Sequence, residues 1–371
     1  MIAYRSLSAA ILCALALGCA GRAPAPAPAD SAPTPTAKTT ADALIPREVL
    51  FGNPDRAGVR LSPDGRFVSW LAPLNGVLNV YVAPAGALDQ ARPITQDAKR
   101  GIRKYEWAFD GAHLLYLQDT EGDENYRVHR VHVESGTTVD LTPFPGARAD
   151  LAGLSSDVPG AALILINKRD PRLMDLYRVD LATGELTEVL RNEAGYTEFV
   201  VDLQLKPRLV QRFTPDGGTE YLKLVGDKAE PFMKVPQEDT LTTHAYGFDG
   251  SGKTLYMVDS RGRDTGALFA IDMASGQAKL LGEDAHADVD EVLTHPKTGE
   301  VQAWASSYTR REWHFVDPAM RTDFETLAGV ARGELYVTSR TLDDRFWIVA
   351  FDTDDGPMRV YRYDRENRKA D

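Results

Sequence analysis

One template recurs seven times along the chain, at intervals of 45 to 49 residues. Each copy contains an alternating run such as Leu176-Tyr177-Arg178-Val179, and the position after this run marks the period. The seven marked positions are Ala83, His132, Asp180, Asp227, Asp272, Asp317 and Asp364. A fixed period of this size, built from short alternating segments, is typical of a β-propeller with one blade per repeat. Because a single blade cannot bury its own apolar faces, we expect the ring to fold as a unit.

The repeat predicts an all-β fold, a seven-bladed β-propeller with four-stranded blades and an incomplete last blade. The blades are expected to begin near Val59, Tyr105, Ala149, Thr197, Thr243, Val289 and Gly333. Turn sequences such as Ser62-Pro63-Asp64-Gly65 separate the strands, because proline fixes one backbone dihedral and glycine accepts a positive φ. Six blades are expected to have four strands each, and the seventh supplies three before the polar residues 365–371. Either an N-terminal strand near residues 48–51 closes the ring, or the natural chain continues.

Acidic residues at regular positions have structural explanations. Aspartate ends the expected third strand of five blades, at Asp180, Asp227, Asp272, Asp317 and Asp364. This repetition favours a carboxylate that accepts hydrogen bonds in the hairpin turn. A second set superficially resembles a calcium loop, namely Asp119, Glu121, Asp123 and Asn125. It lacks the glycine at the sharp turn and the distant bidentate glutamate, so we predict a polar hairpin whose carboxylates bond backbone N–H groups, and no metal site.

Composition excludes several classes of function. The formal net charge is −12, which argues against a nucleic-acid partner because phosphate neutralisation needs a basic face. Both cysteines, Cys13 and Cys19, lie within the first 19 residues. We therefore expect no disulfide, thiol redox centre or thiolate metal site in the folded part, and no cofactor.

The first 43 residues are predicted to be a targeting segment followed by an extended tether. Residues 1–18 are predicted to be a signal peptide, since Arg5 precedes an apolar stretch that is too short for a membrane span. The run Ala16-Leu17-Gly18-Cys19 resembles a bacterial lipoprotein cleavage box, which predicts lipidation of Cys19, and a plain signal peptide is the alternative. Residues 19–43 are rich in Ala, Pro and Thr and are expected to form an extended tether. We expect a periplasmic propeller over residues 44–371, attached to the outer membrane only through this lipid.

Short segments of the chain resemble the propeller of the prolyl-oligopeptidase family of serine peptidases. The most specific is Gly122-Asp123-Glu124-Asn125-Tyr126, which resembles a Gly-Asp-Glu-Asn segment of that family. The other segments are residues 45–51, 61–65, 308–311 with 314–318, and 344–349 with 361–364. The resemblance covers about residues 44–371 and is closest to bacterial acylaminoacyl- and dipeptidyl-peptidase-like members.

The resemblance implies a role beside a catalytic domain. In the family, the propeller precedes an α/β-hydrolase domain with a Ser-Asp-His triad, restricts access to it and forms part of the peptide-binding cavity. These 371 residues contain no Gly-x-Ser-x-Gly nucleophile elbow, since Gly153-Leu154-Ser155-Ser156-Asp157 lacks the last glycine. We therefore expect no catalytic residue, and a propeller that works with peptide or a separately encoded hydrolase domain. The alternative is a stand-alone envelope lipoprotein that binds proteins as a scaffold.

Four arginines are candidates for contact with a peptide carboxylate. They occur in two short segments, as Arg261 with Arg263 and as Arg310 with Arg311. A guanidinium group recognises a carboxylate through two parallel hydrogen bonds, so these side chains fit that task if they face the central cavity. Solvation of the protein surface is the alternative explanation.

Overall fold

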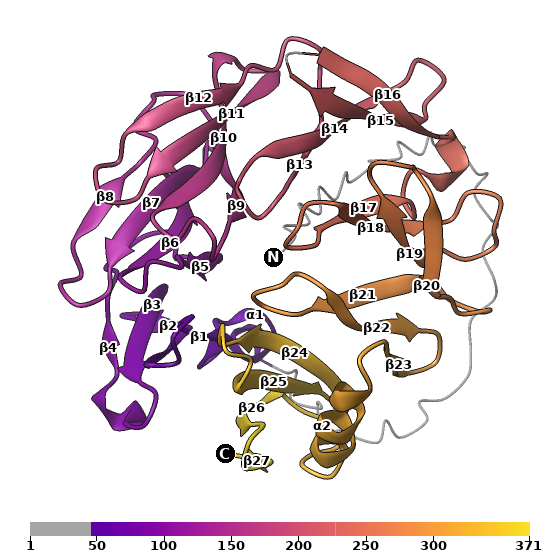
Figure 1. Ribbon diagram of the computed structural model, residues 1–371. Coiled ribbons are helices and arrows are strands. Elements are labelled where there is room, and N and C mark those ends of the chain that lie inside the picture. The colour runs from indigo at the N-terminus through magenta and orange to yellow at the C-terminus, as the bar shows by residue number, and fades with distance from the viewer. Residues whose placement is uncertain (1–45, 227) are drawn as a thin grey trace, which may run out of the picture. The chain divides into compact units, whose positions relative to one another are not determined.

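The computed structural model describes residues 46–226 and 228–371. Within residues 54–371, which form one compact unit, seven antiparallel sheets surround a central axis (Figure 1). The predicted seven-bladed β-propeller is therefore confirmed. The signal segment, Cys19 and the tether lie outside the described residues, as does Asp227. No helix in the described part of the chain is long and apolar enough to span a membrane.

The first three blades each contain four strands that follow one another in sequence. Blade one consists of β1 (Ala57–Leu61), β2 (Phe67–Leu74), β3 (Val77–Pro84) and β4 (Arg92–Pro93), with a 3-10 helix at Leu88–Gln90. Blade two consists of β5 (Tyr105–Trp107), β6 (His113–Gln118), β7 (Arg127–His132) and β8 (Thr138–Asp140). Blade three consists of β9 (Ala149–Leu154), β10 (Ala161–Asp170), β11 (Leu173–Asp180) and β12 (Leu186–Leu190).

The remaining blades follow the same order, with one exception in blade six. Blade four consists of β13 (Glu198–Val201), β14 (Pro207–Phe213), β15 (Thr219–Val225) and β16 (Lys228–Val235), followed by a 3-10 helix at Gln237–Asp239. Blade five consists of β17 (His244–Phe248), β18 (Thr254–Asp259), β19 (Ala267–Asp272) and β20 (Ala278–Gly282). Blade six has β21 (Val289–Thr294), β22 (Val301–Ser307), β23 (Arg311–Phe315) and helix α2 (Pro318–Ala328). Blade seven has β24 (Glu334–Arg340), β25 (Phe346–Asp352), β26 (Arg359–Asp364) and β27 (Lys369–Ala370).

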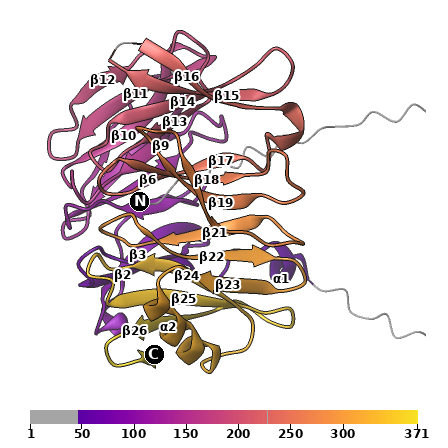
Figure 2. The ribbon, with the colours of Figure 1, turned by 45° about the vertical axis from the view of Figure 1, so that its right-hand side comes forward.

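Helix α2 replaces the fourth strand that was predicted for blade six, so that prediction is wrong (Figures 1 and 2). The side chain of Asp317 caps the helix by accepting a hydrogen bond from the Ala319 N–H at 3.0 Å. Pro318 occupies the first helical position, where a missing N–H is harmless. Met320, Phe324 and Leu327 are buried at spacings of three and four residues, which place them on one face of a helix.

Direct contacts between blades seven and one close the ring. The Leu61 N–H donates to Ser339 Oγ at 3.0 Å, and the Leu342 N–H donates to the Pro63 carbonyl at 2.8 Å. Blade seven has only three strands of full length, as predicted, and the two-residue β27 pairs with the end of β26. In the described part of the chain, no strand from another blade joins this sheet. The strand predicted near residues 48–51 is wrong, because residues 47–51 form the short helix α1 (Arg47–Phe51).

The apolar core lies between neighbouring sheets. One cluster packs Leu115 and Val128 of blade two against Ile164 and Ile166 of blade three. Each blade therefore depends on its neighbours for burial, as the repeat predicted.

The aspartates after the third strands accept hydrogen bonds in the turns, as predicted, at Asp180, Asp272 and Asp364. Asp180, for example, accepts from the Thr183 N–H at 2.7 Å. Because successive strands of a blade run in opposite directions, successive connections lie on opposite faces of the ring. We call the face with the first-to-second-strand turns the turn face, and the opposite face the loop face.

Candidate functional site

A cavity of about 390 Å³ lies at the centre of the ring, among the innermost strands of five blades. Its wall includes charged side chains from four of these blades: Arg60 on β1, Glu106 on β5, Glu291 on β21 and Arg340 on β24. Apolar residues of the turn face, including Phe109 and Leu342, complete the wall. The cavity therefore offers both charges and apolar surface to a ligand.

An ion pair joins blades one and two at this wall. Arg60 Nη2 lies 2.6 Å from Glu106 Oε1, and the glutamate side chain is buried. Burial raises the pKa of Glu106 to about 8 and lowers the pKa of Arg60, because both charged forms lose contact with water. The short contact between the two groups favours their charged forms and opposes that effect. The charge of Glu106 therefore depends on two opposing effects, burial and the contact with Arg60.

A second ion pair links β21 to β23. Arg311 Nη1 lies 2.5 Å from Glu291 Oε2 and its Nη2 lies 3.4 Å from Asp290 Oδ2. The guanidinium also lies over the ring of Tyr336, 4.4 Å from its centroid. Burial raises the pKa of Glu291, against the pull of Arg311. Arg311 Nε and Asp290 Oδ1 are buried without a hydrogen-bond partner among the described residues.

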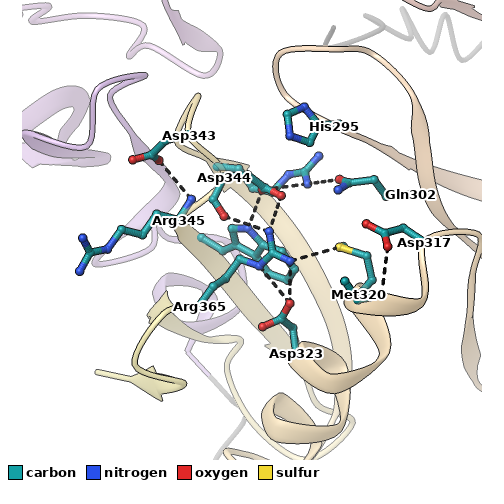
Figure 3. Close-up of polar contacts among 12 residues, drawn as sticks. His295, Gln302, Asp317, Met320, Asp323, Asp343, Asp344, Arg345 and Arg365 are labelled. Atoms are coloured by element: carbon teal, nitrogen blue, oxygen red, sulfur yellow. Dashed lines mark hydrogen bonds and ion pairs between the residues drawn. The ribbon is translucent and has the colours of Figure 1, made fainter.

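Arg340 of the cavity wall contacts Asp344. From Asp344 a network of ion pairs passes through Arg365 to Asp323 of α2 (Figure 3). Arg340 donates to Gln302 Oε1 at 2.7 Å and to Asp344 Oδ1 at 3.0 Å. Burial lowers the pKa of Arg340 to about 10. Asp344 also accepts from Arg365 Nη1 at 2.5 Å, and Arg365 Nε donates to Asp323 of α2 at 2.9 Å. The network fixes one side of the cavity to the outer part of the ring.

The structure separates the four predicted arginines. Arg311 alone contacts a residue of the cavity wall, Glu291. Arg261 forms an ion pair with Asp259 at 2.8 Å, and Arg263 forms one with Glu283. Arg310 is exposed, 3.6 Å from Asp354 and 4.0 Å from Glu334. A role of these arginines in peptide binding stays a prediction.

Sequence reasoning missed all four charged residues of the cavity wall, Arg60, Glu106, Glu291 and Arg340. A signal was present, because Arg60 and Glu106 each stand between two apolar residues of an expected innermost strand.

The acidic hairpin after β6 is polar, as predicted. Asp123 Oδ1 accepts from the Thr120 and Asn125 N–H groups, each at 3.1 Å. Within residues 46–226 and 228–371, no group of three or more His, Cys, Asp or Glu side chains is placed to hold a metal ion.

Two peptidases match most of the chain in sequence, although no family model matches it. It is 48% identical over 323 residues to dipeptidyl aminopeptidase BIII of Pseudoxanthomonas mexicana, which is 87% of this chain and 47% of that protein. It is 28% identical over 353 residues to dipeptidyl peptidase family member 6 of Caenorhabditis elegans, which is 90% of this chain and 47% of that protein. The chain is a β-propeller of the prolyl oligopeptidase family. It spans about half the length of the curated relatives it matches.

Solved structures agree with this family propeller in fold. A structure from a study of two prolyl endopeptidases matches with a TM-score of 0.55 at 16% identity, over 85% of this chain and 48% of that chain. The crystal structure of a puromycin hydrolase matches with a TM-score of 0.53 at 16% identity, over 86% of this chain and 53% of that chain. At this level of identity the likeness concerns the architecture alone.

Proposed function

We propose that this family propeller is the non-catalytic part of a dipeptidyl-peptidase-like serine peptidase. In that role it admits peptides to the active site and contributes part of their binding cavity. The observation that carries the proposal is the 48% identity to dipeptidyl aminopeptidase BIII over 323 residues. The central cavity supports it, because side chains of both charges stand on an otherwise partly apolar wall, a combination typical of ligand sites.

The loop face carries the surface on which a hydrolase domain would dock. Four large apolar side chains on this face are strongly exposed: Phe213 at 68%, Leu241 at 91%, Tyr308 at 71% and Met358 at 52%. Phe213 is the last residue of the second strand β14, and the other three lie in connections from a second to a third strand or from one blade to the next. Exposed apolar groups gathered on one face are typical of an interaction site. Docking of a hydrolase domain would remove them from water.

Complex formation tests the docking part of the proposal. The purified chain is mixed with the catalytic portion of dipeptidyl aminopeptidase BIII, and association is followed by size-exclusion chromatography and titration calorimetry. Leu241→Asp should abolish association, because it places a charge in the contact. Val189→Asp is the matched control, since Val189 is exposed on the outer strand β12. Equal association of both variants would contradict docking on the loop face.

The envelope scaffold is the second candidate, and the run Ala16-Leu17-Gly18-Cys19 favours a place in the envelope for either one. We propose that lipid on Cys19 holds the propeller at the periplasmic side of the outer membrane. Cys19→Ser should move the protein from the membrane to the soluble envelope fraction, and unchanged fractionation would contradict the anchor.

Reading the genome downstream of codon 371 separates the two functions, because a hydrolase reading frame there favours the peptidase.

A further inference from the structure

A second pocket lies on the loop face, between blades two and three, and has a volume of about 240 Å³. Its wall is formed by residues that precede β5, follow β6 and lie at the beginning of β9. The polar and aromatic side chains that matter for binding are Arg100, Arg103, Asp119, Tyr126, Arg148 and Asp150. Asp119 and Tyr126 flank the Gly-Asp-Glu-Asn segment in the sequence, and Arg100 lies beside its glycine, Gly122. The central cavity gives this segment no role.

Asp119 supplies an acceptor that the protein leaves unused. The residue is 8% exposed, and its Oδ1 atom lies 3.5 Å from Arg100 Nε. Its Oδ2 atom is buried and has no hydrogen-bond partner among the described residues. An unsatisfied buried carboxylate oxygen is unfavourable and rare in native proteins. A ligand with a strong hydrogen-bond donor would satisfy it.

Two cations of the pocket are also available. Arg103 and Arg148 are exposed, and neither forms an ion pair with a described residue. Arg148 lies over the ring of Tyr126, with its Cζ atom 5.9 Å from the centroid. Such a guanidinium is suited to a carboxylate, which it binds through two parallel hydrogen bonds. The pocket thus presents an acceptor and two free cationic donors to one small volume.

The backbone around these groups is held in place before any ligand binds. Asp97 accepts hydrogen bonds from the Arg100 N–H at 3.0 Å, from Gln118 Nε2 at 3.2 Å and from the Gly101 N–H. Gly122 has a φ of 89°, a backbone conformation that residues with a side chain rarely adopt. The glycine of the Gly-Asp-Glu-Asn segment therefore permits the turn that lies beside the guanidinium of Arg100.

We propose that this pocket binds a small zwitterion, namely a free amino acid or a dipeptide. Its ammonium group donates to Asp119 Oδ2, and its carboxylate is held by Arg103 and Arg148. The volume of 240 Å³ is below the range of about 300–1,000 Å³ that is usual for drug-sized ligands, which fits a ligand of this size. Binding needs no catalytic domain, so its failure would leave the peptidase proposal standing.

Titration calorimetry of the full 371-residue chain tests the proposal with three probes. L-alanyl-L-alanine carries both charges, its N-acetyl derivative lacks the ammonium, and its C-terminal amide lacks the carboxylate. The free dipeptide should bind at least about tenfold more tightly than either derivative, because each loses one charge-assisted interaction. Equal binding of all three, or no binding of any at millimolar concentration, would overturn the proposal.

Two variants assign the two ends of the ligand, and a third is the control. Asp119→Asn should weaken binding of the dipeptide without weakening binding of the N-acetyl derivative. Arg103→Gln, at an exposed position where folding is not at risk, should weaken the dipeptide but not the amide. Arg332→Gln is the control, since Arg332 is exposed and far along the chain in another blade. If inorganic phosphate competes equally well in wild type and Asp119→Asn, the pocket is a plain anion site and the zwitterion is excluded.

Discussion

Asp344 is the central acceptor of the polar network that connects blade six, blade seven and α2. Its carboxylate accepts from Arg340, from Arg365 and from Trp347 Nε1 at 2.8 Å. Replacing it by asparagine leaves two largely buried guanidinium groups without this counter-ion. We predict that Asp344→Asn lowers the free energy of unfolding by about 3–5 kcal/mol, as the breaking of a buried ion pair does. Urea unfolding of the purified variant measures this loss.

The neighbouring Asp343→Asn is the matched control for this prediction. Asp343 is exposed and accepts from the Arg345 N–H at 3.1 Å, without a buried ion pair. Its replacement should change the free energy of unfolding by less than about 1 kcal/mol. Similar losses for the two variants would show that the charge of Asp344 is not what holds this network.

Glu106 should make stability depend on pH in a defined window. Burial raises the pKa of Glu106 from 4.5 to about 8 in the folded state. Between these two values the folded chain holds a proton at this site that the unfolded chain has lost, so this contribution to stability falls as pH rises. Glu106→Gln cannot ionise and should lose this part of the pH dependence. We expect the melting temperature of wild type to fall more steeply than that of the variant from pH 5 to pH 8, and parallel curves would mean that Arg60 keeps Glu106 ionised throughout.

At the scale of elements, the N-terminal cap stabilises helix α2. Asp317 accepts from the Ala319 N–H at 3.0 Å, which satisfies one of the free donors of the first turn. Asp317→Ala should therefore lower the free energy of unfolding by about 0.5–2 kcal/mol, and Asp317→Asn should have little effect because asparagine caps equally well. Thermal unfolding of both variants measures the difference. Equal losses for the two would point to the charge of Asp317 instead of its capping oxygen.

Most strands could be predicted from the sequence, because alternation and turn residues are local signals. The exception is instructive, since Asp317-Pro318 and the spacing of Met320, Phe324 and Leu327 are local helix signals as well. They stand where the repeat predicts a fourth strand, and in the structure the local helix pattern overrides the period. The helix at residues 47–51 stands where one of the two alternatives for ring closure places a strand.

At the scale of the whole molecule, the cavity could not be predicted because its residues come from distant repeats. Arg60 and Glu106 are 46 positions apart in the sequence and form one ion pair at 2.6 Å. Glu291 and Arg340 reach the same cavity from blades six and seven. The pattern within one repeat places a charged residue on an innermost strand, but only the closure of the ring brings these side chains together.

Peptide hydrolysis by the purified 371-residue chain, alone and with the catalytic portion of dipeptidyl aminopeptidase BIII, tests the proposed function most directly. A serine nucleophile needs an adjacent base and an oxyanion hole, and blade strands commit their amide groups to sheet hydrogen bonds. The chain alone should therefore release no product from a chromogenic dipeptide substrate and bind no fluorophosphonate covalently. When the chain is mixed with the catalytic portion, hydrolysis of large peptides should slow, while release of product from the chromogenic dipeptide substrate should continue. Turnover or stoichiometric fluorophosphonate labelling of the chain alone would contradict the account.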